Sequence, residues 1–126
     1  MTYASSSKAL TEKIIDCIIQ VHQELGPGFL ENIYRNALLI ELRRHGLRVE
    51  AEKEVPVRYR GVEVGKHRLD LLVEGRVVLE LKSVDQLTGV HYAQLRSYLK
   101  ATGCEVGLLV NFNDSRADFR RVELEG

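Results

Sequence analysis

The sequence has few of the features that mark a secreted, membrane-bound or strongly charged protein. Its 126 residues contain only two cysteines, Cys17 and Cys104, and two prolines. The cysteines have no metal-ligand spacing, which argues against a disulfide scaffold and favours reduced, buried thiols. The 18 basic side chains equal the 18 acidic side chains in number, so no overall field attracts a nucleic acid or a membrane. A polyanion would therefore need a local patch.

Long hydrophobic runs are also missing. No stretch approaches the roughly 18 residues that a membrane span requires, and residues 1–8 lack the apolar region of a signal peptide. We therefore expect a cytoplasmic protein with no membrane partner. With 44% hydrophobic and 29% charged residues, the composition is typical of one globular domain. We predict that this domain covers residues 11–126 and that residues 1–10 form a flexible segment.

The spacing of hydrophobic residues predicts three helices and five strands. The helices are predicted at about residues 11–25, 30–45 and 89–100, with Thr11 as the N-cap of the first. The strands are predicted at about residues 49–60, 66–73, 76–82, 106–112 and 119–124. Pro56 places the first strand at an edge or at a bulge, and the apolar fourth strand is expected to be buried and reached by a crossover. The predicted fold is α/β with a mixed sheet, in the order α-α-β-β-β-α-β-β.

Charged residues stand on two adjacent predicted strands, Asp70 on one and Glu80 with Lys82 on the next. The loop between the strands decides whether Asp70 meets Glu80. A two-residue loop would place Asp70 across from Leu79. A three-residue loop over residues 74–76 pairs Asp70 with Glu80 and merges four leucines onto one face, so burial favours it. These leucines are Leu69, Leu71, Leu79 and Leu81.

In the favoured register the two carboxyl groups stand on Cβ atoms about 5 Å apart. Like charges at this separation repel unless a proton or a divalent cation lies between them. Lys82 falls opposite Arg68, a pair of cations that an anion would relieve. These four groups suit a hard metal ion with a phosphate, although a solvated face of alternating charge remains an equal alternative.

Three more polar residues could line such a site from the predicted helices. Glu31 lies on one stripe with Leu38 and Leu42, which turns it partly inward, although a carboxylate in the first turn can also simply complement the helix dipole. Gln94 and Tyr98 are one helical turn apart. They could hydrogen-bond a phosphate or a base, or they could be ordinary surface residues.

Taken together, these residues resemble the PD-(D/E)XK nuclease superfamily and, within it, the GxxExxY family. The motif of that family corresponds to residues 28–34. The core motif is Asp70, nine intervening residues, and then Glu80-Leu81-Lys82, while residues 94–98 resemble the QxxxY helix motif. The likeness extends from about Thr11 to Leu124. Leu69 replaces the proline that gives the superfamily its "PD", a backbone preference that carries no chemistry.

The resemblance implies a restriction-endonuclease-like fold and metal-dependent hydrolysis of phosphodiester bonds in DNA. The ligands of Mg²⁺ or Mn²⁺ would be Asp70, Glu80 and Glu31. Lys82 would position or activate the attacking water. The substrate would be contacted by Gln94, Tyr98, Tyr34 and Arg68.

Two other functions stay open on the sequence alone. The chain could be a catalytically inactive module that keeps the nuclease fold and binds nucleic acid or a protein partner. It could also be a homodimer or the catalytic part of a larger nuclease assembly, because 126 residues with no net charge offer little surface for grasping a duplex.

Overall fold

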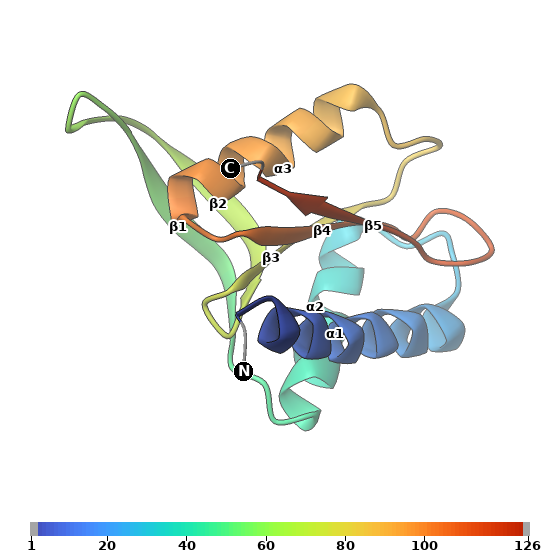
Figure 1. Ribbon diagram of the computed structural model, residues 1–126. Coiled ribbons are helices and arrows are strands. Elements are labelled where there is room, and N and C mark those ends of the chain that lie inside the picture. The colour runs from blue at the N-terminus through green and yellow to red at the C-terminus, as the bar shows by residue number, and fades with distance from the viewer. Residues whose placement is uncertain (1–2, 125–126) are drawn as a thin grey trace.

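The computed structural model describes residues 3–124, which form three layers (Figure 1). Two helices, α1 (Tyr3–Leu25) and α2 (Glu31–Arg44), cover one face of a five-stranded sheet, and α3 (Gly89–Thr102) covers the other. The strands are β1 (Val49–Tyr59), β2 (Val62–Val73), β3 (Val77–Lys82), β4 (Val106–Asn111) and β5 (Asp118–Glu123). The predicted mixed α/β fold and its element order are confirmed.

The strands lie side by side in sequence order. All neighbours are antiparallel except β3 and β4, which are parallel because α3 crosses over between them. Helices cover both faces of β4, and every residue of that strand is buried. Pro56 lies on the edge strand β1, next to a register shift between Val57 and Arg58, so both features predicted from this proline are present. Within residues 3–124, no helix is long and apolar enough to cross a membrane.

The sheet divides the hydrophobic core into two parts. The part beneath α1 and α2 includes Ile14, Ile18, Tyr34, Leu38, Leu79, Leu81 and Phe112. The part beneath α3 includes Leu69, Leu72, Val78, Leu95, Leu99 and Leu109. Both cysteines are free and buried, as predicted, and burial raises the pKa of the Cys17 thiol to about 11.

The first helix begins at Tyr3, so the prediction that Thr11 is its N-cap is wrong. Thr11 lies inside the helix, where its Oγ1 donates a hydrogen bond to the Ser7 carbonyl oxygen (2.6 Å). Ser7 is buried and its Oγ accepts a hydrogen bond from Arg76 Nη2 (3.2 Å), next to the turn between β2 and β3. Residues 3–10, assigned from sequence to a flexible segment, therefore form the first turns of α1; residues 1–2 lie outside the described residues.

The alternation of side chains between the two sides of the sheet is interrupted part-way along the β1–β2 hairpin. Leu71 packs beneath α1 and α2, but Leu69 packs beneath α3, so the prediction that these two leucines share a face is wrong. The exchange occurs beside Glu52, whose φ of 52° is left-handed. The pairing of β1 with β2 keeps one register on both sides of Glu52 but omits Glu52 itself. A left-handed residue other than glycine is costly, so its place here is maintained by the surrounding structure.

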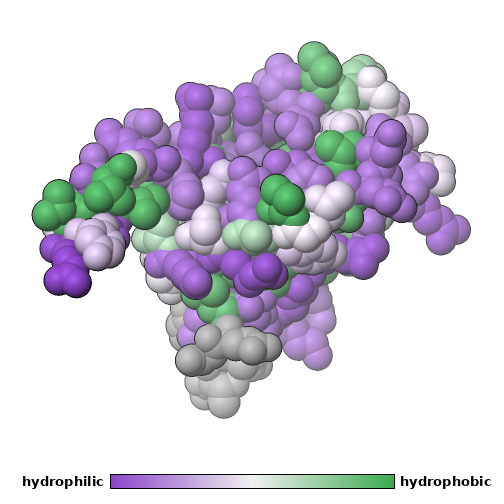
Figure 2. Space-filling view, turned by 90° about the horizontal axis from the view of Figure 1, so that it is seen from above, coloured by the Kyte–Doolittle hydropathy of each residue, from purple (hydrophilic) through white to green (hydrophobic). Residues whose placement is uncertain are grey.

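The β1–β2 hairpin extends well beyond the body of the molecule (Figure 1). Its tight turn consists of Arg60 and Gly61, both with positive φ (50° and 79°), a geometry that matches the twist of the strands. Tyr59, Val62 and Val64 are strongly exposed near this turn. Figure 2 shows hydrophobic residues gathered at the end of the arm.

Candidate active site

The pairing of β2 with β3 brings Asp70 to Glu80. The register pairs Val73 with Val77, Leu72 with Val78, and Leu71 with Leu79. This is the register of the three-residue loop. The ladder ends at Leu71 and Leu79, and a side-chain hydrogen bond joins the next residues, Asp70 and Glu80. The predicted register is therefore present. Of the four leucines from which it was predicted, Leu71, Leu79 and Leu81 are buried together and Leu69 lies on the other face.

Glu80 is a buried acid, with 3% of its surface exposed. Burial raises its pKa to about 9, and a hydrogen bond with Asp70 together with the charge of Asp70 adds to the rise. The charge of Lys82 and a hydrogen bond from Tyr98 act in the opposite direction. At neutral pH, Glu80 therefore holds a proton between the two carboxyl groups. Asp70 accepts a hydrogen bond at Oδ2 from the Leu81 N–H (2.8 Å).

Two side chains of α3, Gln94 and Tyr98, connect Glu80 to Lys82 through hydrogen bonds. Lys82 Nζ donates to Gln94 Oε1 (3.1 Å), and Gln94 Nε2 donates to the Tyr98 hydroxyl (2.9 Å). Burial, followed by the charge of Glu80, raises the pKa of Tyr98 to about 12, so its hydroxyl keeps its proton and can donate to Glu80. Gln94 and Tyr98 meet because residues four apart lie on one side of a helix. The structure thus joins Glu80, Tyr98, Gln94 and Lys82 in one chain of contacts.

The carboxyl pair lies beside an open hollow of about 510 Å³. The hollow is lined by Leu30, Glu31, Asn32, Arg35, Asp70 and Ser83. Glu31 is exposed at the first turn of α2 and shares the hollow with Asp70, while Glu80 is buried and does not line it. Among residues 3–124, no group of three His, Cys, Asp or Glu residues is arranged to hold a metal ion, so Glu31 does not form a closed cluster with the other two acids.

Asp70 and Glu80 nevertheless fit a hard divalent cation. Mg²⁺ is usually held by one or two carboxylates, with water and substrate phosphate as its other ligands. The proton that Glu80 retains supplies positive charge where two acids meet, and a cation would supply it instead. The open hollow beside Asp70 leaves room for water and for a phosphate.

Tyr34 lies in the core. Its side chain is fully buried and its ring stacks on Phe112, with the ring centroids 4.3 Å apart. Its hydroxyl donates to the Gly26 carbonyl oxygen (2.5 Å) and accepts from the Phe29 N–H (3.2 Å). Tyr34 therefore supports the loop that brings Glu31 to the hollow, and it does not present a surface to a substrate.

Arg68 is exposed and lies close to the carboxylate of Glu52, with 3.8 Å between Nη2 and Oε1. The sequence analysis did not single out Arg35, and the structure shows its half-buried side chain lining the hollow. It also missed Asn111. This buried residue donates from Nδ2 to the Val84 carbonyl oxygen (2.8 Å) and so fixes the segment that follows Lys82. An asparagine ending an otherwise apolar strand is the signal that could have found it.

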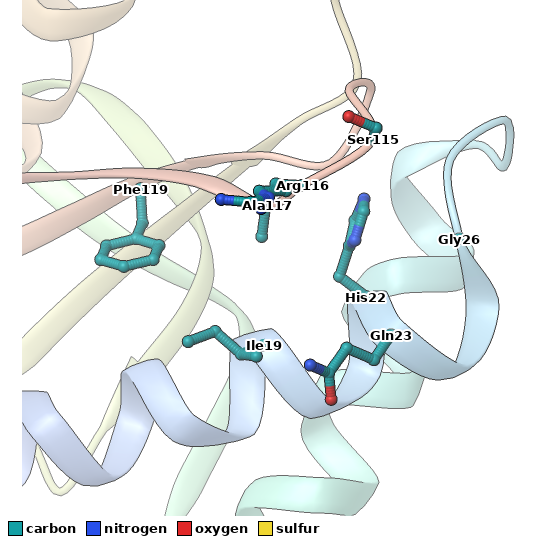
Figure 3. A pocket seen from close by; sticks show the side chains of 8 residues that line it. All are labelled: Ile19, His22, Gln23, Gly26, Ser115, Arg116, Ala117 and Phe119. Atoms are coloured by element: carbon teal, nitrogen blue, oxygen red, sulfur yellow. The ribbon is translucent and has the colours of Figure 1, made fainter.

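A second hollow, of about 520 Å³, lies between the end of α1 and the segment that leads into β5 (Figure 3). It is lined by Ile19, His22, Gln23, Gly26, Ser115, Arg116, Ala117 and Phe119. None of these is a predicted site residue and none is acidic. His22 points between the two elements, where its Nε2 contacts the Asp114 carbonyl oxygen (2.8 Å). The chemistry therefore points to the hollow at Asp70.

Comparisons with known proteins agree with this geometry. A family model described as the PD-(D/E)XK nuclease superfamily matches residues 8–122. A solved structure described as the crystal structure of SSO0001 is 25% identical, with a TM-score of 0.59 over 75% of this chain and 50% of that chain. An alkaline exonuclease, LHK-Exo from Laribacter hongkongensis, is 15% identical, with a TM-score of 0.57 over 99% of this chain and 73% of that one. The chain thus spans about half the length of SSO0001. No curated protein sequence matches it.

Proposed function

The chain belongs to the PD-(D/E)XK nuclease superfamily, and we propose from this premise that it is a metal-dependent nuclease that hydrolyses phosphodiester bonds in DNA. The observation that carries the proposal is the buried contact of Glu80 with Asp70, with Lys82 on the same face of β3. We also assign the chain to the GxxExxY family, because Gly28, Glu31 and Tyr34 keep the spacing of its motif.

Asp70 and Glu80 are the residues that would hold Mg²⁺ or Mn²⁺, with Glu31 as a further acid facing the same hollow. A bound cation lowers the pKa of its water and neutralises charge that develops on the phosphate. Lys82 Nζ, fixed by Gln94, is a compact charge suited to holding a water molecule or a phosphate oxygen. Tyr98 donates to Glu80 and keeps its carboxyl group in place.

The proposed division of labour follows from the two environments of the acids. Asp70 borders the open hollow, where a hydrated cation can enter, and its Oδ2 is oriented by the Leu81 N–H. Glu80 is buried beside Asp70 and would have to release its proton before it could act as a ligand. Lys82 lies on the same face of the strand and its charge favours that release.

A cleavage panel tests the proposal. Labelled DNA and RNA substrates are incubated with Mg²⁺, Mn²⁺ or a chelator, and with wild type, Asp70→Asn or Lys82→Ala. We expect metal-dependent cleavage by wild type and a loss of about a hundredfold or more in both variants, the scale of removing a charged group that acts on the transition state. Lys13→Ala, an exposed lysine on α1, is the matched control and should cleave as wild type does.

Undiminished cleavage by Lys82→Ala would assign the activity to another site or to a contaminant. Nucleic-acid binding without cleavage under either metal would favour the alternative, an inactive module with the nuclease fold. We further propose a cytoplasmic location and assembly with a second copy or a larger partner. Cell fractionation and sedimentation velocity test these two points.

A further inference from the structure

The backbone of β1 is irregular at the position that faces Asp70. The β1–β2 ladder pairs Ala51 with Leu71 and Lys53 with Leu69, so Glu52 falls across from Asp70 without pairing to it. The backbone of Glu52 is left-handed at this point, and the pairing of β1 with β2 keeps one register from Val49 to Val57 on either side of it. Non-glycine residues in this region are rare, and they cluster at sites where a side chain must be placed for function.

Two arginines from different elements converge on the Glu52 carboxylate. Arg35 of α2 places Nη1 3.4 Å from Glu52 Oε1, and Arg68 of β2 places Nη2 3.8 Å from the same oxygen. Arg35 is the more buried of the two, with 20% of its side chain exposed, and it lines the hollow together with Asp70 and Glu31. The two cations therefore meet beside the proposed catalytic hollow.

A guanidinium group carries five N–H donors in a planar fork that matches a phosphate. The contacts with Glu52 are longer than hydrogen bonds, so they hold each arginine loosely. Because both guanidinium groups approach the same oxygen of Glu52, both can contact a single anion at that position.

We propose that Arg35 and Arg68 form a clamp for a backbone phosphate of the substrate, and that Glu52 occupies the place of this phosphate when no nucleic acid is bound. The proposal rests on the proposed function, since its ligand is the nucleic acid that the hollow would cleave. Arg35 and Arg68 are phosphate-binding residues, and Glu52 is the internal anion that the phosphate displaces.

The test measures binding of a short fluorescein-labelled DNA duplex to the full chain by fluorescence anisotropy, in chelator, so that no cleavage occurs. Each of Arg35→Gln and Arg68→Gln should weaken binding by about tenfold, as expected for one charge-assisted contact. Each should also reduce the slope of log K against log salt by about 0.9. Arg44→Gln is the matched control, because it removes the same charge from the exposed end of α2; it should leave both quantities unchanged.

The direction in which Glu52→Gln changes the DNA affinity is the decisive result. The substitution removes the competing anion and keeps both arginines, so it should tighten binding a few-fold, whereas damage to the fold would weaken it. Thermal melting of every variant accompanies the titrations. The clamp is wrong if Arg35→Gln and Arg68→Gln behave as Arg44→Gln does, or if Glu52→Gln weakens binding. Failure of the nuclease proposal is separate, because it would show as no cleavage by wild type under either metal, or as undiminished cleavage by Asp70→Asn, while these binding changes persist.

Discussion

At the residue scale, Glu80 links the proposed chemistry to stability. Its pKa is about 9 in the folded chain, against an ordinary value of 4.5. Between these two pH values the native state holds a proton that the unfolded chain has lost. The stabilisation is thus fully present below about pH 4.5 and is lost as pH rises through about 9, by up to about 1.4 kcal/mol per pH unit.

We predict that Glu80→Gln flattens this dependence. The amide is neutral at every pH and can still donate a hydrogen bond to Asp70, so the free energy of unfolding should fall less steeply than in wild type between about pH 5 and 9. Urea denaturation at several pH values measures this. Glu63→Gln, at an exposed position, is the control and should keep the wild-type slope. Equal slopes in all three proteins would show that Glu80 is ionised in the folded chain.

At the scale of elements, the sequence predicted the part of the site that burial determines. Leu71, Leu79 and Leu81 could be buried together only in the register that places Asp70 against Glu80, so alternation was sufficient. Alternation could not locate Leu69, because the left-handed backbone at Glu52 turns the hairpin over.

Position in the chain was equally misleading for two other residues. Arg35 lies on α2 among solvated residues, and only the approach of β1 brings Glu52 to it. Tyr34 belongs to a recognisable motif, but its ring is covered by Phe112, which is far away in the sequence. Contacts between segments that are distant in the sequence determine where both side chains lie. The spacing of hydrophobic residues along the chain cannot predict such contacts.

The turn of the β1–β2 hairpin offers a stabilising substitution. Arg60 has a φ of 50° directly before Gly61, and asparagine tolerates this conformation far better than arginine. Arg60→Asn should raise the free energy of unfolding by about 0.5–1 kcal/mol, measured by urea denaturation. Arg60→Gln removes the same charge without the preference for positive φ, so it should give no such gain. A gain of the same size in both variants would assign the effect to charge.

The contact of α3 with β4 offers a destabilising substitution. A Cβ on Gly107 would lie 2.8 Å from Leu95 Cδ1, in a fully buried part of the core. We expect Gly107→Ala to lower the free energy of unfolding by about 1–3 kcal/mol, because the buried Leu95 side chain has to shift within a packed core. The matched control is Gly65→Ala in β2, where no atom lies within 4 Å of the added Cβ. Equal effects of the two changes in thermal melting would contradict this close packing.

At the scale of the whole molecule, the candidate site forms only when the complete fold does. Glu31 belongs to α2, Asp70 and Glu80 to neighbouring strands, and Gln94 to the crossover helix on the opposite face of the sheet. A ligand bound between these elements should therefore stabilise the entire chain.

We predict that Mg²⁺ raises the melting temperature of wild type. At about a hundred times its Kd, linkage gives about 2.7 kcal/mol. The shift should be larger near pH 9 than at pH 7, because binding has to displace the proton of Glu80. Asp70→Asn should show a much smaller shift, and NaCl of equal ionic strength controls for screening. Identical shifts in the two proteins would place the ion elsewhere.

The root of the hairpin arm has a mechanical consequence. His67 of β2 contacts Ser97 Oγ through Nε2 (3.0 Å), and its ring lies on that of Tyr98, with the centroids 4.6 Å apart. Tyr98 in turn touches Glu80. The base of the arm is thus connected through His67 and Tyr98 to the carboxyl pair, and β2 itself carries Asp70. A ligand held at the tip of the arm would therefore bear on the candidate site.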